Sequence, residues 1–343
     1  MKNNFDTVDV LSSFSSKLME LILLPTEQCN FRCTYCYEDF ELGKMEDSTI
    51  RGIENLISKR ISELKSLRLS WFGGEPLLAL GVIWRVLEHA KKECDKHSVQ
   101  LSGGFTTNGY KLSVELAKRL SEYGQNNYQI TLDGFGEVHD QTRISKSGKG
   151  TFKKIWTNLI ALRDSDLAQL RITIRIHLTQ SNHEVITELV DQVKKEFGGD
   201  QRFRIHFHRI ENLGGNNKVE LLSRDVYEER LKELNQRLNG AIESDNELEG
   251  NKDGSNYICY AARPNSILIR SNGRLGKCTV ALNDDYNDIG FINEDGSLII
   301  DNKKLQPWVR GFDSYDVLDL GCPNAGMNNY LYPQHERIRI VEL

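Results

Sequence analysis

The chain has 343 residues, too many for one small core, which predicts a main domain with a smaller one beside it. Hydrophobic residues make up 39% and charged residues 27%, the balance of a folded protein rather than a disordered one. The net charge of −5 offers no electrostatic footprint for a phosphate backbone, which disfavours nucleic acid as the main partner. No apolar run is long enough to cross a membrane and the N-terminus lacks an apolar signal core, so we expect a cytoplasmic protein without a membrane partner.

Short apolar runs alternate with amphipathic patterns through the first 240 residues. The strand-like runs cover 19–25, 68–72, 99–107, 128–133, 171–178 and 203–207. Helical patterns, with apolar residues at three- and four-residue spacing, cover 49–64, 82–94, 113–124, 152–164 and 184–197. Strands that alternate with helices form a parallel sheet with right-handed crossovers. Six such strands are fewer than the eight of a closed barrel, which predicts an α/β fold with an open, partial (β/α)6 TIM-like barrel.

The alternation of strands and helices stops after residue 240. The next segment is polar, acidic and glycine-containing, as in a linker or surface loop. Farther on, strand-like runs at 266–270 and 274–280 flank Asn272-Gly273, a strong hairpin signal. We therefore predict a barrel over 1–240, a linker over 241–256 and a small C-terminal domain over 257–343.

Seven cysteines in such a chain are more typical of metal or redox ligands than of disulfides, because the cytosol keeps thiols reduced. Cys29, Cys33 and Cys36 lie within eight residues, directly after the first predicted strand. Three thiolates so close in sequence can bind three corners of a cubane iron–sulfur cluster and leave the fourth iron open to a substrate. A zinc site, which would want a fourth Cys or His, and a chance grouping are the alternatives. Cys94, late in a helical pattern, is most simply a small buried residue.

The pattern C-x3-C-x2-C, with Tyr35 before its third cysteine, resembles the signature of the radical S-adenosylmethionine (SAM) superfamily. The resemblance continues in chain order through WFGGEPLL at 71–78, TNG at 107–109, TLDG at 131–134 and the segment 139–152. This succession is similar to the peptide- and protein-modifying branch that carries SPASM or Twitch C-terminal domains. It implies a radical SAM barrel with a [4Fe–4S] cluster on the three catalytic cysteines. The chemistry it implies is reductive cleavage of S-adenosylmethionine to methionine and a 5′-deoxyadenosyl radical.

The resemblance also assigns contacts to S-adenosylmethionine. Glu75 would accept a hydrogen bond from the methionine ammonium, beside glycines that let the backbone approach a ligand, although a plain strand-ending turn is the alternative. Arg143 would pair with the methionine carboxylate, unless it is a surface arginine. The complete set of expected cofactor contacts is Tyr35, Gly73, Gly74, Glu75, Pro76, Asn108, Thr131, Asp133 and Arg143.

Some polar residues carry a weaker signal. Asn108-Gly109 is equally typical of a turn, and Tyr35 is expected to pack near the adenine or the cluster. His177, His206 and His208 lie on the last two predicted strands, where histidines are usually packed or solvated. These three histidines are not part of the predicted site.

The C-terminal cysteines resemble a reduced SPASM motif. Cys259, Gly273 and Cys278 match its opening, and Cys322 matches one of its later cysteines. The ligands of a second auxiliary cluster are missing from the pattern. The resemblance therefore implies a Twitch domain, a truncated SPASM domain with one auxiliary [4Fe–4S] cluster. Ordinary cysteines or a zinc site remain as alternatives.

The resemblance implies an oxidoreductase that matures a ribosomally synthesised peptide, with a cyclophane or thioether side-chain crosslink as the favoured product. The alternatives are a peptide epimerase, a sulfatase-maturase-like protein oxidase, a small-molecule radical enzyme, and a non-catalytic iron–sulfur protein for electron transfer or assembly. Thr279 stands where the sulfatase-maturating group has an aspartate base, which argues against that oxidase. The expected partners are a precursor peptide and an electron donor such as flavodoxin or ferredoxin. Because fewer than thirty residues precede Cys29, a leader peptide would bind the barrel, the small domain or a separate protein.

Overall fold

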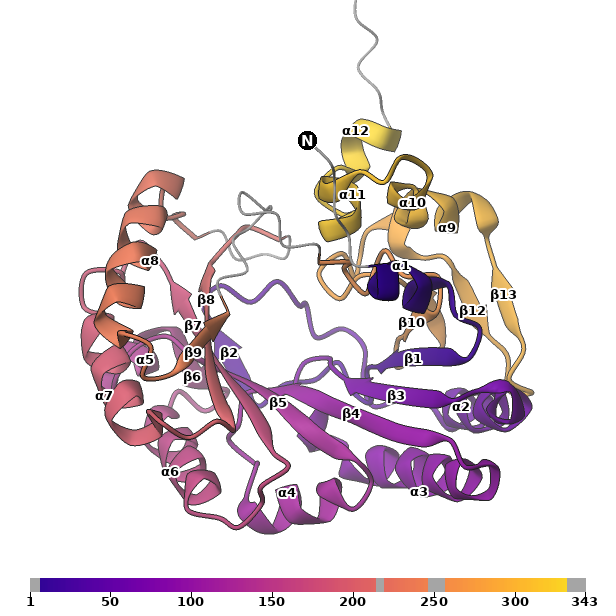
Figure 1. Ribbon diagram of the computed structural model, residues 1–343, viewed down its shortest axis with the longest axis horizontal. Helices are drawn as coiled ribbons and strands as arrows, with labels where there is room; N and C mark the ends of the chain where they lie inside the picture. Colours follow the sequence, from indigo (N-terminus) through magenta and orange to yellow (C-terminus); the bar gives the residue numbers. More distant parts are fainter. Residues whose placement is uncertain (1–6, 214–218, 246–256, 332–343) are drawn as a thin grey trace, which may run out of the picture.

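The computed structural model describes residues 7–213, 219–245 and 257–331, and Figure 1 shows a strongly curved sheet with helices along its outer side. Within these ranges, eleven strands form one sheet in the order β13-β12-β11-β10-β1-β3-β4-β5-β7-β8-β9. The six predicted strands and their parallel pairing are confirmed. They are β1 (Leu18–Leu23), β3 (Ser66–Trp71), β4 (Gln100–Thr107), β5 (Gln125–Leu132), β7 (Arg171–Leu178) and β8 (Phe203–Arg209).

Helices cover the outer side of this sheet, and the five predicted helices are confirmed with shifted ends (Figure 1). They are α2 (Asp47–Arg60) with the short 3₁₀ turn η1 (Ile61–Glu63), α3 (Leu80–His97), α4 (Val114–Ser121), α6 (Phe152–Arg163) and α7 (Thr187–Phe197). A sixth helix, α8 (Arg224–Leu238), was not predicted. Its buried residues Tyr227, Leu231, Leu234 and Leu238 recur at helical spacing, but the long charged residues between them hide the pattern.

Strand alternation decides which side chains face the interior of the barrel. In β7, Ile172, Ile174 and Ile176 have no exposed surface and pack in the core beneath the helices. Because successive side chains of a strand point to opposite faces, Arg175 and His177 face the interior. The polar positions of the strands therefore line the inside of the half-barrel.

The C-terminal segment extends the same sheet. The predicted hairpin is confirmed as β10 (Ser266–Ile269) and β11 (Arg274–Gly276), with Gly273 in the left-handed region at φ 84°. β10 pairs parallel with β1, and β12 (Gly290–Ile292) and β13 (Leu298–Ile300) follow antiparallel. The turn η3 (Asp285–Asn287) lies between β11 and β12. After β13 come α9 (Asn302–Val309), α10 (Gly311–Ser314), α11 (Val317–Gly321) and α12 (Met327–Leu331).

Part of the predicted linker has regular structure. Residues 243–245 form β9 (Glu243–Asp245), which pairs parallel with β8, so the prediction of a linker is wrong for these residues. The acidic character of the segment concealed a strand at the sheet edge, where charged side chains are common. Residues 246–256 of that linker lie outside the described residues.

Four short elements complete the description. They are α1 (Thr7–Phe14), α5 (Glu137–Thr142), the turn η2 (Pro76–Leu78), and a separate two-stranded sheet of β2 (Phe31–Cys33) and β6 (Arg143–Ser145). In the part of the chain that the structure describes, no helix has both the length and the apolar character needed to cross a membrane.

Candidate cluster and cofactor site

The three-cysteine loop follows β1 at the end of the sheet where parallel α/β folds build their sites. Within the loop, β2 pairs antiparallel with β6, and this register places Cys33 directly opposite Arg143. The sulfur of Cys29 accepts a hydrogen bond from the Phe31 backbone N–H at 3.3 Å. Cys36 accepts one from the backbone of Glu38. In both cases the donor is the backbone N–H two residues after the cysteine.

The donors in this loop fit an iron–sulfur cluster. Burial raises the pKa of Cys29 and Cys36 to about 12, so these thiols ionise only when a cation takes the place of the proton. Backbone N–H groups aimed at sulfur are a feature by which proteins tune cluster sulfurs. Among the described residues, no three His, Cys, Asp or Glu side chains converge on one point as a mononuclear zinc site requires. A cubane instead takes each thiolate on a different iron.

Glu75 has a fixed orientation beside this loop. Its carboxylate is wholly buried and accepts hydrogen bonds from the Leu77 N–H at 3.0 Å, the Thr107 hydroxyl at 2.7 Å and the Asn108 N–H at 2.7 Å. Burial raises its pKa above the ordinary value. Pro76 follows it as the first residue of η2. Three donors from two strand ends hold the carboxylate in one place.

The two glycines before Glu75 serve the chain itself. A Cβ on Gly73, which has φ 108°, would lie 2.3 Å from the Thr26 carbonyl oxygen, and one on Gly74 would lie 2.5 Å from that of Gln28. The interpretation that these glycines let the backbone approach a ligand is therefore incomplete. Their nearest neighbour is the backbone that leads into Cys29, so they seat the cysteine loop against β3.

Asn108 combines both roles considered for it. Its side-chain oxygen accepts the Tyr110 N–H at 3.0 Å, which is the turn-forming role. Its side-chain nitrogen lies 2.9 Å from the Asn30 side-chain oxygen and 3.9 Å from the Cys29 sulfur. The turn after β4 thus also contacts the cysteine loop.

The Tyr35 hydroxyl is the centre of a buried polar network. It lies 3.1 Å from Asp133 Oδ1 and 3.1 Å from His177 Nδ1, and it accepts a hydrogen bond from Arg143 Nη1 at 2.7 Å. Asp133 also accepts the Thr142 hydroxyl at 2.6 Å. Burial alone would raise the pKa of Asp133, but the hydrogen bond with His177 and the charge of Arg143 hold it below its ordinary value. Asp133 is therefore a carboxylate inside the barrel.

The network corrects two expectations. Arg143 is 8% exposed, so the alternative that it is a surface arginine is wrong, because pairing with β2 draws β6 over the barrel end. Tyr35 acts as a hydrogen-bond junction rather than only a packing group. Thr131, also 8% exposed, lies two residues before Asp133 and faces the same interior.

Cys259, Cys278 and Cys322 come together in the C-terminal segment, where burial, followed by the nearness of Cys278 and Cys322, raises the pKa of Cys259 to about 12. The Cys259 N–H bonds the Leu320 carbonyl at 2.9 Å, which brings the loop of Cys322 alongside. Cys278 Sγ accepts the Val280 N–H at 3.4 Å, the same two-residue pattern as in the first loop. Cys94 is buried in the core of α3, as expected.

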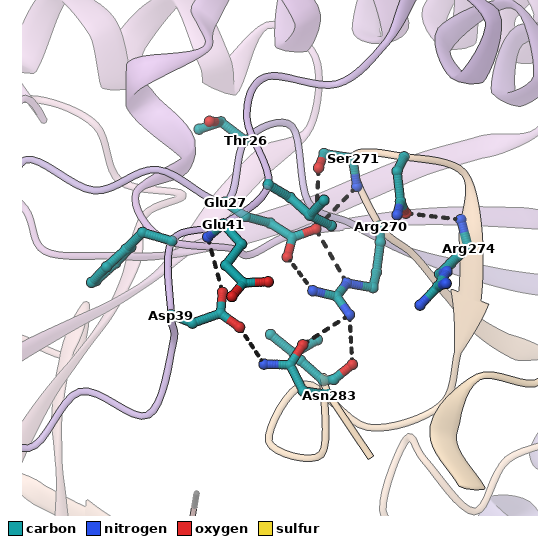
Figure 2. Close-up of polar contacts among 12 residues, drawn as sticks. Thr26, Glu27, Asp39, Glu41, Arg270, Ser271, Arg274 and Asn283 are labelled. Atoms are coloured by element: carbon teal, nitrogen blue, oxygen red, sulfur yellow. Dashed lines mark hydrogen bonds and ion pairs between the residues drawn. The ribbon is translucent and has the colours of Figure 1, made fainter. Parts of the chain in front are cut away.

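A buried ion pair joins the C-terminal segment to the first barrel loop (Figure 2). Arg270 Nη2 lies 2.6 Å from Glu27 Oε2, and Glu27 Oε1 also accepts the Ser271 N–H at 3.2 Å. The other end of Arg270 donates to the Leu282 carbonyl at 2.6 Å. Asn283 donates to Asp39 at 2.7 Å on the same side. Arg270 thus fixes the turn between β10 and β11 to the chain before the cysteine loop, and Asn283, which also bonds Arg270, contacts the chain after it.

A family model for the radical SAM superfamily matches residues 23–193, which hold the cysteine loop, Glu75, Asp133 and Arg143. The chain belongs to the radical SAM superfamily. A radical SAM domain implies a [4Fe–4S] cluster and S-adenosylmethionine, and Cys29, Cys33 and Cys36 are the donors here that fit the cluster.

Three similar proteins illustrate the range of the superfamily. The cysteine-type anaerobic sulfatase-maturating enzyme of Clostridium novyi (strain NT) is 26% identical over 190 residues, 53% of this chain and 48% of that protein. The GTP 3′,8-cyclase of Trichodesmium erythraeum (strain IMS101) is 25% identical over 291 residues, 79% of this chain and 83% of that protein. The solved structure of native anSMEcpe with bound AdoMet and the Kp18Cys peptide has a TM-score of 0.64 at 22% identity, covering 86% of this chain and 82% of that one. The chain spans about half the length of the first curated relatives that it matches.

Two residues of the radical SAM site were not predicted. His177 was set aside as a packed histidine, yet it bonds both Tyr35 and Asp133. In the strand RITIRIHL, His177 lies on the polar face opposite three isoleucines, and this pattern could have indicated that it faces the barrel interior. Tyr37, after Cys36, donates its hydroxyl to the Thr279 carbonyl at 3.2 Å, next to Cys278. No local pattern announces a contact between residues so distant in the sequence.

Proposed function

We propose that this radical SAM enzyme modifies a ribosomally synthesised peptide by hydrogen abstraction and forms a side-chain crosslink, of the cyclophane or thioether kind. The observation that carries the proposal is a hydrogen bond between the two cysteine loops. Tyr37, next to Cys36, donates its hydroxyl to the carbonyl of Thr279, next to Cys278. A peptide substrate would enter between these two loops.

The chain's own residues have separate tasks in this proposal. Cys29, Cys33 and Cys36 would hold the [4Fe–4S] cluster. When bound, the cluster supplies reductive cleavage of S-adenosylmethionine to methionine and a hydrogen-abstracting 5′-deoxyadenosyl radical. Glu75 accepts the ligand ammonium, and Arg143 donates to a carboxylate through its buried Nε, which has no partner among the described residues. The remaining expected cofactor contacts, Tyr35, Gly73, Gly74, Pro76, Asn108, Thr131 and Asp133, position these groups.

The C-terminal cysteines would hold one auxiliary [4Fe–4S] cluster. Asn287 is buried and braces the loop of Cys278: its oxygen accepts the Lys277 and Cys278 N–H groups at 2.9 and 3.0 Å, and its nitrogen donates to the Cys278 and Ala281 carbonyls. A loop held at four backbone groups suits a rigid cofactor. Such a cluster would supply a place for the electron that each oxidative crosslink releases.

A peptide substrate is supported by the likeness to a sulfatase-maturating enzyme and to anSMEcpe with its bound peptide. Thr279, bonded to Tyr260 at 2.7 Å, replaces the aspartate expected of a sulfatase-maturating base, which favours crosslinking over that oxidation. The longer match to a GTP 3′,8-cyclase favours a nucleotide as the second candidate substrate.

The first test is formation of 5′-deoxyadenosine by the anaerobically reconstituted, reduced protein. We expect product from the native chain and none from Cys33→Ala. Cys94→Ala is the matched control, because Cys94 is buried in α3 away from both loops, and it should retain activity. A native chain that binds iron but cleaves no S-adenosylmethionine would favour a non-catalytic iron–sulfur protein.

The second test is mass spectrometry of the small peptide encoded beside this gene, co-expressed with the enzyme without oxygen. A loss of two hydrogens per modification would support the crosslink. An unchanged mass with deuterium incorporated from heavy water would indicate epimerisation instead. An untouched, unlabelled peptide together with turnover of GTP would replace the proposal with the nucleotide candidate.

The third test counts iron to examine the auxiliary cluster. A Cys29/Cys33/Cys36→Ala variant should keep the iron and the absorbance of one cluster, and further replacement of Cys259, Cys278 and Cys322 should remove both. Complete loss of cluster iron from the folded triple variant would contradict the auxiliary cluster.

A further inference from the structure

Arg175 lies in the middle of β7, on the face opposite the buried isoleucines of that strand. The strand register places it level with Thr131 on β5 and with His206 on β8. It shares its face with His177, two residues farther along. The guanidinium is therefore inside the half-barrel, next to the layer of the Tyr35 network.

The charge of Arg175 has no partner among the described residues. Its Nε is buried and makes no hydrogen bond there, and no ion pair involves the residue.

The nearby carboxylate is already engaged by other groups. Asp133 accepts hydrogen bonds from Thr142 and Tyr35 and lies 3.3 Å from His177. Arg143 differs from Arg175 in this respect, since it lies beside Cys33 and Asp133 and bonds the Tyr35 hydroxyl. Arg143 thus has polar partners in the interior, whereas Arg175 has none among the described residues.

The surrounding histidines do not supply the missing negative charge. Burial lowers the pKa of His177 to about 4, and burial together with the charge of Arg175 lowers that of His208 as well. Both rings are neutral near pH 7 and serve as hydrogen-bonding groups. Burial also lowers the pKa of Arg175, but a guanidinium keeps its charge at neutral pH. An uncompensated buried charge is destabilising, and a bound anion relieves it.

We propose that Arg175 binds a carboxylate of a ligand in the barrel interior, from an acidic side chain or the C-terminus of the peptide substrate. The planar fork of arginine matches a carboxylate, which would orient the peptide before hydrogen abstraction. The methionine carboxylate of S-adenosylmethionine is the other source of the same chemistry. The inference deepens the proposed function and rests on it for the peptide nature of the ligand.

Stability of the ligand-free protein is the first test. Arg175→Met removes a partly buried charge that has no partner among the described residues, so its melting temperature should equal or exceed that of the native chain. Arg171→Met is the matched control, because Arg171 is exposed on the same strand and should leave the melting temperature unchanged. A fall of several degrees in Arg175→Met alone would reveal an internal partner and overturn the proposal.

Binding to the reconstituted protein is the second test. The probes are N-acetyl-Gly-Glu-Gly-amide and its glutamine analogue, measured calorimetrically, and S-adenosylmethionine, measured by equilibrium dialysis. We expect a preference for glutamate of about tenfold or more, the effect of one charge-assisted hydrogen bond, that is lost in Arg175→Met and kept in Arg171→Met.

The two probes distinguish the sources of the carboxylate. Weakened binding of S-adenosylmethionine alone would assign Arg175 to the cofactor carboxylate and overturn the peptide assignment. If Arg175→Met leaves the binding of the glutamate peptide and of S-adenosylmethionine unchanged, the site itself is overturned. Because neither measurement needs turnover, a failure to form 5′-deoxyadenosine would refute the proposed function without deciding this one.

Discussion

At the scale of single residues, the Tyr35 hydroxyl connects groups from four parts of the chain. It lies in the cysteine loop, while Asp133 directly follows β5, Arg143 begins β6 and His177 belongs to β7. Buried polar groups of this kind stabilise the structure only while every member keeps its partners. One hydroxyl therefore links the cysteine loop to Asp133, Arg143 and His177.

Replacing Tyr35 with phenylalanine should destabilise the protein by roughly 1–3 kcal/mol, because buried groups of Arg143 and Asp133 lose a hydrogen-bond partner. Urea unfolding of the cluster-free protein measures this change. Tyr110→Phe is the control, since the Tyr110 hydroxyl makes no hydrogen bond among the described residues, and it should be close to neutral. Equal effects from the two substitutions would contradict the network.

A second residue-scale prediction concerns acid. His139 is wholly buried, its Nδ1 accepts the Asp133 N–H at 3.3 Å, and burial lowers its pKa from 6.5 to about 4. The folded state thus resists a proton that the unfolded state accepts. Its contribution is present above pH 6.5 and is lost as pH falls toward 4, by up to roughly 3 kcal/mol.

Urea midpoints at pH 7.5, 6 and 5 test this dependence. His139→Gln should flatten the fall in stability between these values, whereas His97→Gln, at an exposed position, should reproduce the native profile. A native profile in His139→Gln would assign the acid sensitivity to other groups.

At the scale of elements, the contact between the first barrel loop and the β10–β11 turn rests on the Glu27–Arg270 pair. Both side chains are under 10% exposed, and hydrogen bonds from Ser271 complete the carboxylate. Breaking a buried pair leaves one charge uncompensated, which is far costlier than losing an exposed pair.

Arg270→Met should therefore destabilise the protein by roughly 3–5 kcal/mol, and adding Glu27→Gln should recover part of this loss. The matched control is Lys59→Met, which removes an exposed ion pair with Asp295 between α2 and the C-terminal segment and should cost less than about 1 kcal/mol. Additive effects of the two substitutions at Glu27 and Arg270 would show that they do not act as a pair.

At the scale of the whole molecule, the barrel and the C-terminal segment share one core. β10 pairs with β1 over four residues, and Ile269, Leu275, Trp308 and Met327 belong to the same buried cluster as the barrel residues. The helix–strand alternation suggested two units because it ends near residue 240. Sheet pairing between residues far apart in sequence carries no local signal.

A chain that ends at residue 256 should consequently fail to fold into a stable barrel, because it exposes the edge of β1 and part of the core. The expected result is insoluble protein, or soluble protein that melts without a cooperative transition in calorimetry. The full chain is the control. Cooperative melting of the shortened chain would establish the barrel as an independent unit.

Local sequence patterns account for the elements and for the chemistry of the first loop. Six strands, five helices and the hairpin at Asn272-Gly273 follow from periodicity and turn chemistry, which act over a few residues. The spacing of Cys29, Cys33 and Cys36 is likewise a local property. The burial of Arg143, the place of His177, the Glu27–Arg270 ion pair and the lack of a partner for Arg175 among the described residues arise from tertiary contacts. These depend on sheet register and on contacts between distant residues, and a side chain's partner across the barrel leaves no trace in its own neighbourhood of the sequence.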